Sequence, residues 1–220
     1  MVTIAHVVRK LMKDKPFIQE CMNENLINFG ALAEYLKPDI EKELGKDVKH
    51  LAISMALRRY TEDHQKSPLL QLKIDAKSEL IAIANQIEII VKKSSRALVA
   101  INKFANGLKI EDGDRLSVIQ GSREISIVVN AKHYDKLKSS LSGEKIISIK
   151  RNLGIILMYI PKKYIDTPGF FYFLSKCLSF NNVNMLGMSN IKTEVSFLFE
   201  NDDLPRAYEI LCELIPKENS

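Results

Sequence analysis

The chain has 220 residues, which is enough for one large domain or for two or three small ones. Hydrophobic residues make up 46% of it and charged residues 27%, a balance that excludes collagen-like, disordered and disulfide-scaffold chains. The net charge of +5 is too small to imply a polyanionic partner by itself.

The sequence carries no sign of membrane insertion, secretion, metal binding or catalysis. No apolar run reaches the roughly 18 residues that a membrane helix needs, and the N-terminal residues do not resemble a signal peptide. The three cysteines and four histidines are scattered without zinc-ligand spacing, and the common phosphate-binding, hydrolase and zinc-protease motifs are missing. We therefore expect a cytoplasmic protein that is not an enzyme, with no metal, no cofactor and no membrane contact.

The first 62 residues predict a helical, helix-turn-helix-like domain. Apolar residues recur with helical spacing near the start, and proline, asparagine, glycine and aspartate stand where helices begin and end. The expected helices cover residues 3–13, residues 16–22, a segment capped by Asn28, a segment that restarts at Pro38 and ends near Gly45, and residues 48–60 capped by Asp47.

The helix expected over 48–60 is a candidate DNA-recognition helix. One side of it is apolar, with Leu51 and Met55 among its members, and basic or polar residues follow the other side. Residues 1–66 hold 11 basic and 10 acidic residues, so a net charge of +1 gives little general attraction to DNA. A helical packing or dimerisation domain is therefore the alternative. The candidate nucleic-acid contacts are Lys46, Lys49, His50, Ser54, Arg58 and Arg59.

A polar, proline-containing linker follows at 61–68, and residues 63–85 as a whole join the helical domain to what comes next. The stretch 69–85 fits either a helix that continues into a strand or two short strands. The sequence leaves these two alternatives open.

From residue 86 the pattern β-α-β-β-α occurs twice. Residues 87–91 correspond to 155–159 with an offset of 68, and 124–127 correspond to 194–197 with an offset of 70. A split β-α-β unit of this kind is ferredoxin-like, so the predicted fold class is α+β, with repeats at 86–151 and 152–220. The expected elements are strands 86–91, 116–120, 124–129, 145–150, 154–160, 183–188 and 194–199, and helices 96–105, 132–141, 169–180 and 204–215.

The second repeat contains the turn Tyr164-Ile-Asp-Thr-Pro-Gly-Phe170 between its first strand and first helix. This turn resembles the D-x-P-G-x turn of ACT domains, which are small regulatory modules that bind amino acids. The segment VNMLGMSNIKTEVSFLFENDDLPRAYEIL is similar to the end of aspartate kinase regulatory regions. The segment INFGALAEYLKPDIEKELGK resembles the helical part of archaeal-type regulatory proteins with tandem ACT domains.

The resemblance implies a ligand at an interface between two ACT units, in contact with this turn and with the strand after the helix. Proline fixes φ, glycine lets the backbone approach closely, and a helix N-terminus suits a carboxylate. Asp166 then either accepts a ligand ammonium or caps the helix. The first copy has Lys92-Lys-Ser-Ser95 instead, so we expect it to be a structural partner. The implied ligand contacts are Ile165, Asp166, Thr167, Pro168, Gly169, Phe170, Val183, Asn184 and Met185.

Taken together, the sequence predicts a regulatory protein whose small-molecule effector is an amino acid. The ACT resemblance implies a homo-oligomer, a dimer or higher, that assembles through the repeats. Two functions stay open: a ligand-responsive transcription regulator with DNA as partner, and a regulatory subunit or interaction module, not binding DNA, that controls an amino-acid metabolic enzyme.

Overall fold

The computed structural model describes residues 2–64, 74 and 78–216. The chain divides into two compact units, Met1–Leu72 and Lys73–Ser220, which are described separately. Within the described residues, no helix combines the length and the apolar character needed to cross a membrane.

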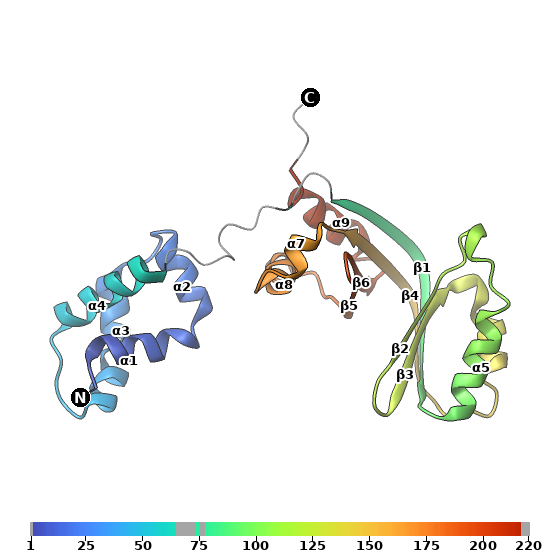
Figure 1. The fold of residues 1–220 in the computed structure, drawn as a ribbon, viewed down its shortest axis with the longest axis horizontal. Coiled ribbons are helices and arrows are strands. Elements are labelled where there is room, and N and C mark those ends of the chain that lie inside the picture. Colours follow the sequence, from blue (N-terminus) through green and yellow to red (C-terminus); the bar gives the residue numbers. More distant parts are fainter. Residues whose placement is uncertain (1, 65–73, 75–77, 217–220) are drawn as a thin grey trace. The chain divides into compact units, whose positions relative to one another are not determined.

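The first unit consists of helices whose ends follow the local sequence. The Thr3 hydroxyl accepts a hydrogen bond from the His6 N–H at 3.3 Å, and the Asn28 side chain accepts from the N–H groups of Gly30 and Ala31. Both are N-caps of the expected kind. The helices are α1 (Ile4–Lys13), α2 (Pro16–Asn23), α3 (Phe29–Leu44) and α4 (His50–His64) (Figure 1).

The expectation that Pro38 starts a new helix is wrong, because α3 continues through it. Pro38 lies on the exposed side of α3, while Leu36 and Ile40 on either side of it are fully buried. Their burial outweighs the one backbone hydrogen bond that proline removes. The helix ends at Gly45, which has φ +66°, as the sequence predicts.

The apolar side predicted for the last helix of this unit is wrong in part. Val48, Ala52 and Ala56 pack in the core, but Leu51 and Met55 do not. Leu51 is 69% exposed and Met55 49% exposed, whereas Ile53, Leu57 and Tyr60 are buried in the core of the unit. Two apolar stripes run along α4, and only packing against α1 and α3 decides which one is covered.

The second unit is built on one six-stranded antiparallel sheet with the strand order β2-β3-β1-β4-β6-β5. The elements match the order of the two predicted repeats. They are β1 (Glu79–Lys92), α5 (Ser95–Ala105), β2 (Leu116–Gln120), β3 (Glu124–Asn130), α6 (Tyr134–Ser140), β4 (Ile146–Tyr159), α7 (Lys162–Ile165), α8 (Phe170–Phe180), β5 (Gly187–Ile191), β6 (Glu194–Glu200) and α9 (Leu204–Glu213), with short 3₁₀ turns at Ile110–Asp112 and Ala131–His133.

The strands β1 and β4 have 14 residues each and serve both repeats. Residues 86–92 of β1 pair with β3, as the first strand of the first repeat. Residues 79–83 pair with 155–159 of β4 and supply the fourth strand of the second repeat. The alternatives left open for 69–85 thus resolve into a strand over 79–85, while 69–73 and 75–77 lie outside the described residues.

The two strands expected at 145–150 and 154–160 form the single strand β4, which crosses the boundary expected at 151/152. Asn152 takes up the junction with φ +58°, and Asn85 does the same in β1 with φ +57°. Asparagine adopts this left-handed conformation more readily than most residues, so each strand bends without breaking. The register of the β1–β4 pair shifts at this point, between Ile83 and Gln86.

The helices cover one face of the sheet. Ile89 and Ile127 are paired neighbours on that face and lie in a core with α5 and α6. In the second repeat, Gly154 lies against Leu204 of α9. Successive side chains of a strand point to opposite faces of the sheet. Val128 and Ile155, which each follow or precede a helix-facing residue, belong to a separate cluster on the face without helices. The cluster contains Val128 from the first repeat and Ile155 and Leu157 from the second. These residues come together on one face because the long strands β1 and β4 are curved (Figure 1).

Candidate ligand-binding sites

The connection between β4 and α8 contains the turn that resembles ACT domains. It spans residues 160–169 and includes α7. Gly169 has φ +86°, a conformation that L side chains rarely adopt, and it immediately precedes α8, which no side chain caps. Phe170 is 1% exposed and its ring stacks on Tyr164 with 5.7 Å between centroids. A buried aromatic pair therefore anchors the turn at Gly169.

Asp166 does not cap α8. It stands at the C-terminal end of α7, and Gly169 occupies the N-cap position of α8. The side chains of Asp166 and Pro168 are exposed, while Ile165 and Thr167 are half-buried. The helix-cap alternative for Asp166 is therefore wrong, and its carboxylate faces solvent beside the turn.

The second group of predicted contacts lies at the other end of α8. Val183 is 3% exposed and its N–H donates to the Leu178 carbonyl at 3.1 Å. Asn184 is exposed and Met185 half-buried. These residues precede β5, which begins at Gly187 and not at 183 as the sequence predicted.

The two predicted groups do not meet within one chain. The Ile160 N–H donates to the Thr193 carbonyl, beside the turn that joins β5 to β6. The Leu186 N–H donates to the Leu198 carbonyl, at the opposite end of β5. A five-residue strand separates these ends by about 13 Å at the usual rise per residue. If these residues bind a ligand, a single chain therefore carries two half-sites.

The equivalent connection in the first repeat is much shorter, with only residues 93 and 94 between β1 and α5. The Ser94 hydroxyl oxygen accepts from the Ala97 N–H at 2.9 Å and donates to Glu144 Oε2 at 2.7 Å. The start of α5 is thus capped by its own chain, in contrast to the start of α8.

The candidate nucleic-acid contacts are mostly on the surface of the first unit, but two face their own chain. His50 Nε2 lies 2.8 Å from the Gly30 carbonyl oxygen, and the Arg58 guanidinium lies 5.6 Å from the centre of the Phe29 ring. Ser54 is half-buried. The remaining three, all exposed, are Lys46, Lys49 and Arg59.

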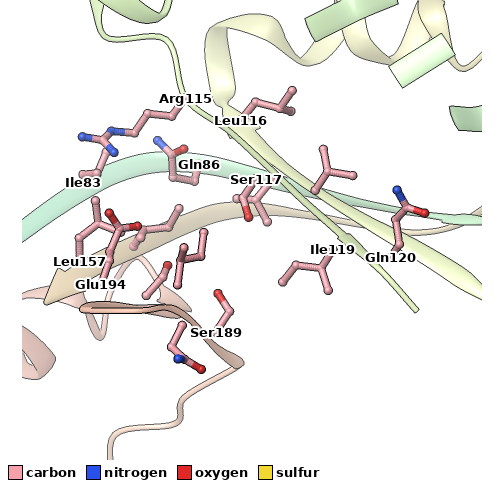
Figure 2. Close-up of a pocket in the computed structure, with 16 residues that line it drawn as sticks. Ile83, Gln86, Arg115, Leu116, Ser117, Ile119, Gln120, Leu157, Ser189 and Glu194 are labelled. Carbon is pink, nitrogen blue, oxygen red and sulfur yellow. The ribbon is translucent and has the colours of Figure 1, made fainter. Parts of the chain in front are cut away.

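Sequence reasoning missed a groove on the helix-free face of the sheet. It has a volume of about 530 Å³ and continues into a smaller lobe of about 120 Å³. Residues from both repeats line it, including β2 of the first repeat and β5 of the second. Figure 2 shows Arg115, Gln86 and Glu194 toward one end, with Ser189 and Ile119 toward the other.

Polar groups at one end of the groove are unusually placed. Gln86 is 1% exposed; its Nε2 donates to the Ala84 carbonyl at 2.9 Å, and its Oε1 has no hydrogen-bond partner among the described residues. Burial, together with a hydrogen bond to the Glu194 carboxylate, raises the pKa of Tyr159 at the same end. No group of three or more His, Cys, Asp or Glu side chains in the described residues is arranged to hold a metal ion.

One signal in the sequence points to this groove. Ser126 and Ser196 occupy equivalent places in the two repeats, each between two apolar residues, and both line the smaller lobe. Alternation puts such serines on the face away from the helices. The groove itself depends on the curl of the sheet, which no local pattern encodes.

No protein-family model matches the chain, and no curated protein sequence does either. Solved structures do match. The regulatory subunit of aspartate kinase from Thermus thermophilus matches with a TM-score of 0.51 and 10% identity, over 63% of this chain and 98% of that one. Aspartate kinase from Clostridium acetobutylicum matches with a TM-score of 0.51 and 16% identity, over 62% of this chain and 34% of that one. The kinase from Synechocystis matches with a TM-score of 0.51 and 15% identity, over 67% and 28%.

These matches confirm the predicted α+β fold, with ACT-type βαββαβ units in the second compact unit. The chain spans about a third of the length of the two kinases and nearly the whole of the Thermus regulatory subunit. At identities of 10 to 16% the likeness concerns the fold alone.

Proposed function

We propose that this chain is a regulatory protein, without catalytic activity of its own, that binds an amino acid at an interface between two ACT-type units. The fold that it shares with an aspartate kinase regulatory subunit supports the regulatory role. The observation that carries the site is the difference between the two strand-to-helix connections. Only the second repeat has an uncapped helix start preceded by a glycine at φ +86°.

The two half-sites explain why the interface needs a second chain. β5 is an edge strand of the sheet, with Met188 and Ile191 exposed on it. When β5 pairs antiparallel with β5 of a second copy, the end at Ile191 lies opposite the partner's start at Gly187. The turn of one chain then lies beside residues 183–185 of the other, which makes two equivalent sites per dimer.

Each group has a chemical role in this proposal. The Phe170 N–H donates to the Thr167 carbonyl, but no side chain caps α8, so the next N–H groups and the positive end of its dipole suit the ligand carboxylate. Asp166 accepts hydrogen bonds from the ligand ammonium. Gly169 lets the ligand approach the backbone, and Asn184 of the second copy adds a polar contact.

A thermal-shift screen of the purified chain with the twenty amino acids tests the proposal. A ligand at 100 times its Kd adds about 2.7 kcal/mol of apparent stability, which is easily visible in Tm. Gly169→Asp places a negative side chain against the ligand carboxylate and should abolish the shift.

Gly113→Asp is the matched control, because Gly113 also has φ +86° but lies in the first repeat. It should lower Tm by a similar amount and leave the ligand shift intact. A screen in which no amino acid raises Tm contradicts the sensing role. The site is contradicted if Gly169→Asp removes none of the amino-acid shifts, and a chain that stays monomeric with ligand in sedimentation contradicts the interface.

For the helical unit, we propose contact with a protein rather than reading of DNA. His50 and Arg58 are turned toward Gly30 and Phe29, whereas Leu51 and Met55 present an exposed apolar stripe one turn apart on α4. This favours the regulatory subunit or interaction module over the transcription regulator.

Fluorescence anisotropy with random duplex DNA at low salt distinguishes the two. We expect no binding that weakens steeply with salt. Salt-sensitive binding that is lost in Lys49→Glu and kept in Leu51→Ser reverses the preference.

A further inference from the structure

The groove on the helix-free face has the size and enclosure of a small-molecule site, separate from the Gly169 turn. Its volume of about 530 Å³ lies within the range usual for ligand pockets. Both walls come from one chain, since β2 and β5 lie on opposite sides of it. A ligand there needs no second copy.

The first requirement on a ligand comes from Gln86. Its side chain lies on the same sheet face as Val128 and is 1% exposed, and its Oε1 has no partner among the described residues. Buried acceptors are normally satisfied. A ligand that donates a hydrogen bond at this end of the groove supplies what the protein lacks.

The second requirement comes from two opposite charges at the same end. Arg115 and Glu194 both line the groove, and both act on Tyr159, whose pKa the Glu194 carboxylate raises and the Arg115 charge lowers. Among the described residues, Arg115 forms no ion pair with a carboxylate. A ligand with one anionic and one cationic group matches this pair.

The third requirement comes from the floor of the groove, the apolar surface of the sheet that lies beneath a ligand. Val128, Ile155 and Leu157 are 5 to 8% exposed and form one cluster, with Ile83 packed against it. Serine hydroxyls border this cluster from both repeats, at Ser117 and Ser196. The floor accepts an aliphatic chain of a few carbon atoms.

We propose that the groove is a second ligand site, which binds a small zwitterion with an aliphatic side chain, such as leucine. The ligand carboxylate pairs with Arg115, the ammonium donates to Gln86 Oε1 and Glu194, and the side chain lies on Val128, Ile155 and Leu157. The site is complete within one chain and does not depend on a ligand at the Gly169 turn.

Calorimetric titration of the full chain with leucine tests the site. Two probes serve for comparison: 4-methylpentanoate, which lacks the ammonium group of leucine, and 3-methylbutylamine, which lacks its carboxylate. We expect one leucine per chain and at least about tenfold weaker binding of each probe, since each loses a charge-assisted hydrogen bond. Binding of 4-methylpentanoate as tight as that of leucine contradicts the role of Gln86 and Glu194. Absence of binding by leucine, isoleucine, valine and norleucine overturns the proposal.

Variants separate this site from the interface site. Arg115→Gln and Gln86→Leu should each weaken leucine binding about tenfold or more. Arg123→Gln, an exposed arginine at the β2–β3 turn that does not line the groove, should leave it unchanged. Gly169→Asp should also leave it unchanged. If Gln86→Leu fails to fold, the exposed position Arg115 decides the matter alone.

If leucine binding is lost in Gly169→Asp but unchanged in Arg115→Gln and Gln86→Leu, leucine is assigned to the interface. That result would overturn the proposal of a groove site. Loss of an amino-acid response in Gly169→Asp with an intact groove titration supports both sites. If leucine binds in the groove as expected, but no amino acid loses its effect in Gly169→Asp, the groove proposal stands and the interface proposal is refuted.

Discussion

The two ACT-type repeats share one sheet and one topology, but they differ in how the first strand reaches the first helix. The first repeat crosses in two residues and caps α5 with Ser94. The second takes ten residues, 160–169, and leaves α8 without a side-chain cap. The same fold therefore carries a closed helix start in one copy and an open, backbone-lined one in the other.

The repeats also differ in what holds their loops. In the first repeat, Asp114 bonds to Lys132 at 2.6 Å, to His133 at 2.7 Å and to the Lys109 N–H at 2.9 Å, with its side chain 6% exposed. The second repeat relies on apolar packing, with Phe170, Phe197 and Phe199 fully or nearly fully buried. Polar contacts thus hold a loop of the first copy, whereas apolar packing dominates in the second.

The largest expected effect comes from overfilling the second repeat at Gly154. A Cβ there would lie 2.8 Å from both methyl carbons of Leu204, the buried first residue of α9. Gly154→Val should lower the stability of the unit by about 3 kcal/mol, or about 10 °C in Tm. Gly187→Ala is the control in the same repeat, because its nearest neighbour would be 3.8 Å away. Equal Tm values for the two variants would contradict the packing described here.

A smaller but pH-dependent loss is expected from Asp114→Asn in the first repeat. The Lys132 ammonium, the His133 ring and the Lys109 N–H hold the pKa of Asp114 well below its usual range. A lowered folded-state pKa stabilises the fold above the unfolded pKa of about 4, and this contribution disappears as the pH falls further. The Tm difference between wild type and variant should be largest near pH 7 and shrink below pH 4.

The control for this titration is Asp112→Asn, whose side chain is 71% exposed and 3.9 Å from Lys109. It should leave Tm nearly unchanged at every pH. A Tm difference for Asp114→Asn that stays constant down to pH 2 would show that the charge of Asp114 is not what braces the loop.

Next in size is Gly169→Ala, which forces a side chain into φ +86°. A cost of about 1–2 kcal/mol is expected from the left-handed conformation, measured by urea denaturation. No cost at all would mean that the turn rearranges freely, and the open helix start would then not be pre-formed.

The smallest effect is expected at the matching position of the first repeat. Ser94→Ala removes the cap of α5 and the hydrogen bond to Glu144, at a cost of about 1 kcal/mol. Ser94→Thr keeps both the capping oxygen and the hydroxyl that donates to Glu144, and should recover part of the loss. The same denaturation experiment measures both, and a cost above that of Gly154→Val would reverse the order proposed for the two repeats.

The sequence predicts the repeats well because each helix, strand and turn in them is determined by residues close together in the sequence. The offsets of 68 and 70 residues, the hairpin at Gly121 and the stop at Gly45 each rest on a few neighbouring residues. The shared strands escape prediction because Asn152 and Gly154 look like a turn, yet residues 153 and 154 resume pairing with neighbouring strands directly after the left-handed Asn152. In α4 the buried stripe was misassigned, since Leu51 and Ile53 are equally apolar and only packing separates them.

The candidate sites divide in the same way. The Gly169 turn is legible because proline and glycine fix a local conformation. That Ile160, which leads into the Gly169 turn, and Leu186, which follows residues 183–185, lie at opposite ends of β5 follows only from strand register. Gln86 is unremarkable in the sequence, because its importance arises from burial and an unmatched acceptor.

The two long strands make the second repeat depend on residues that precede the first. A fragment that begins at residue 86 keeps every element of the first repeat, but it loses the strand 79–83 that flanks residues 155–159 of the second. The end of β4 then becomes a bare apolar edge, the kind of surface on which sheets of different molecules join and precipitate. The second repeat therefore cannot be excised as residues 152–220 alone, because its fourth strand comes from residues 79–83, before the first repeat.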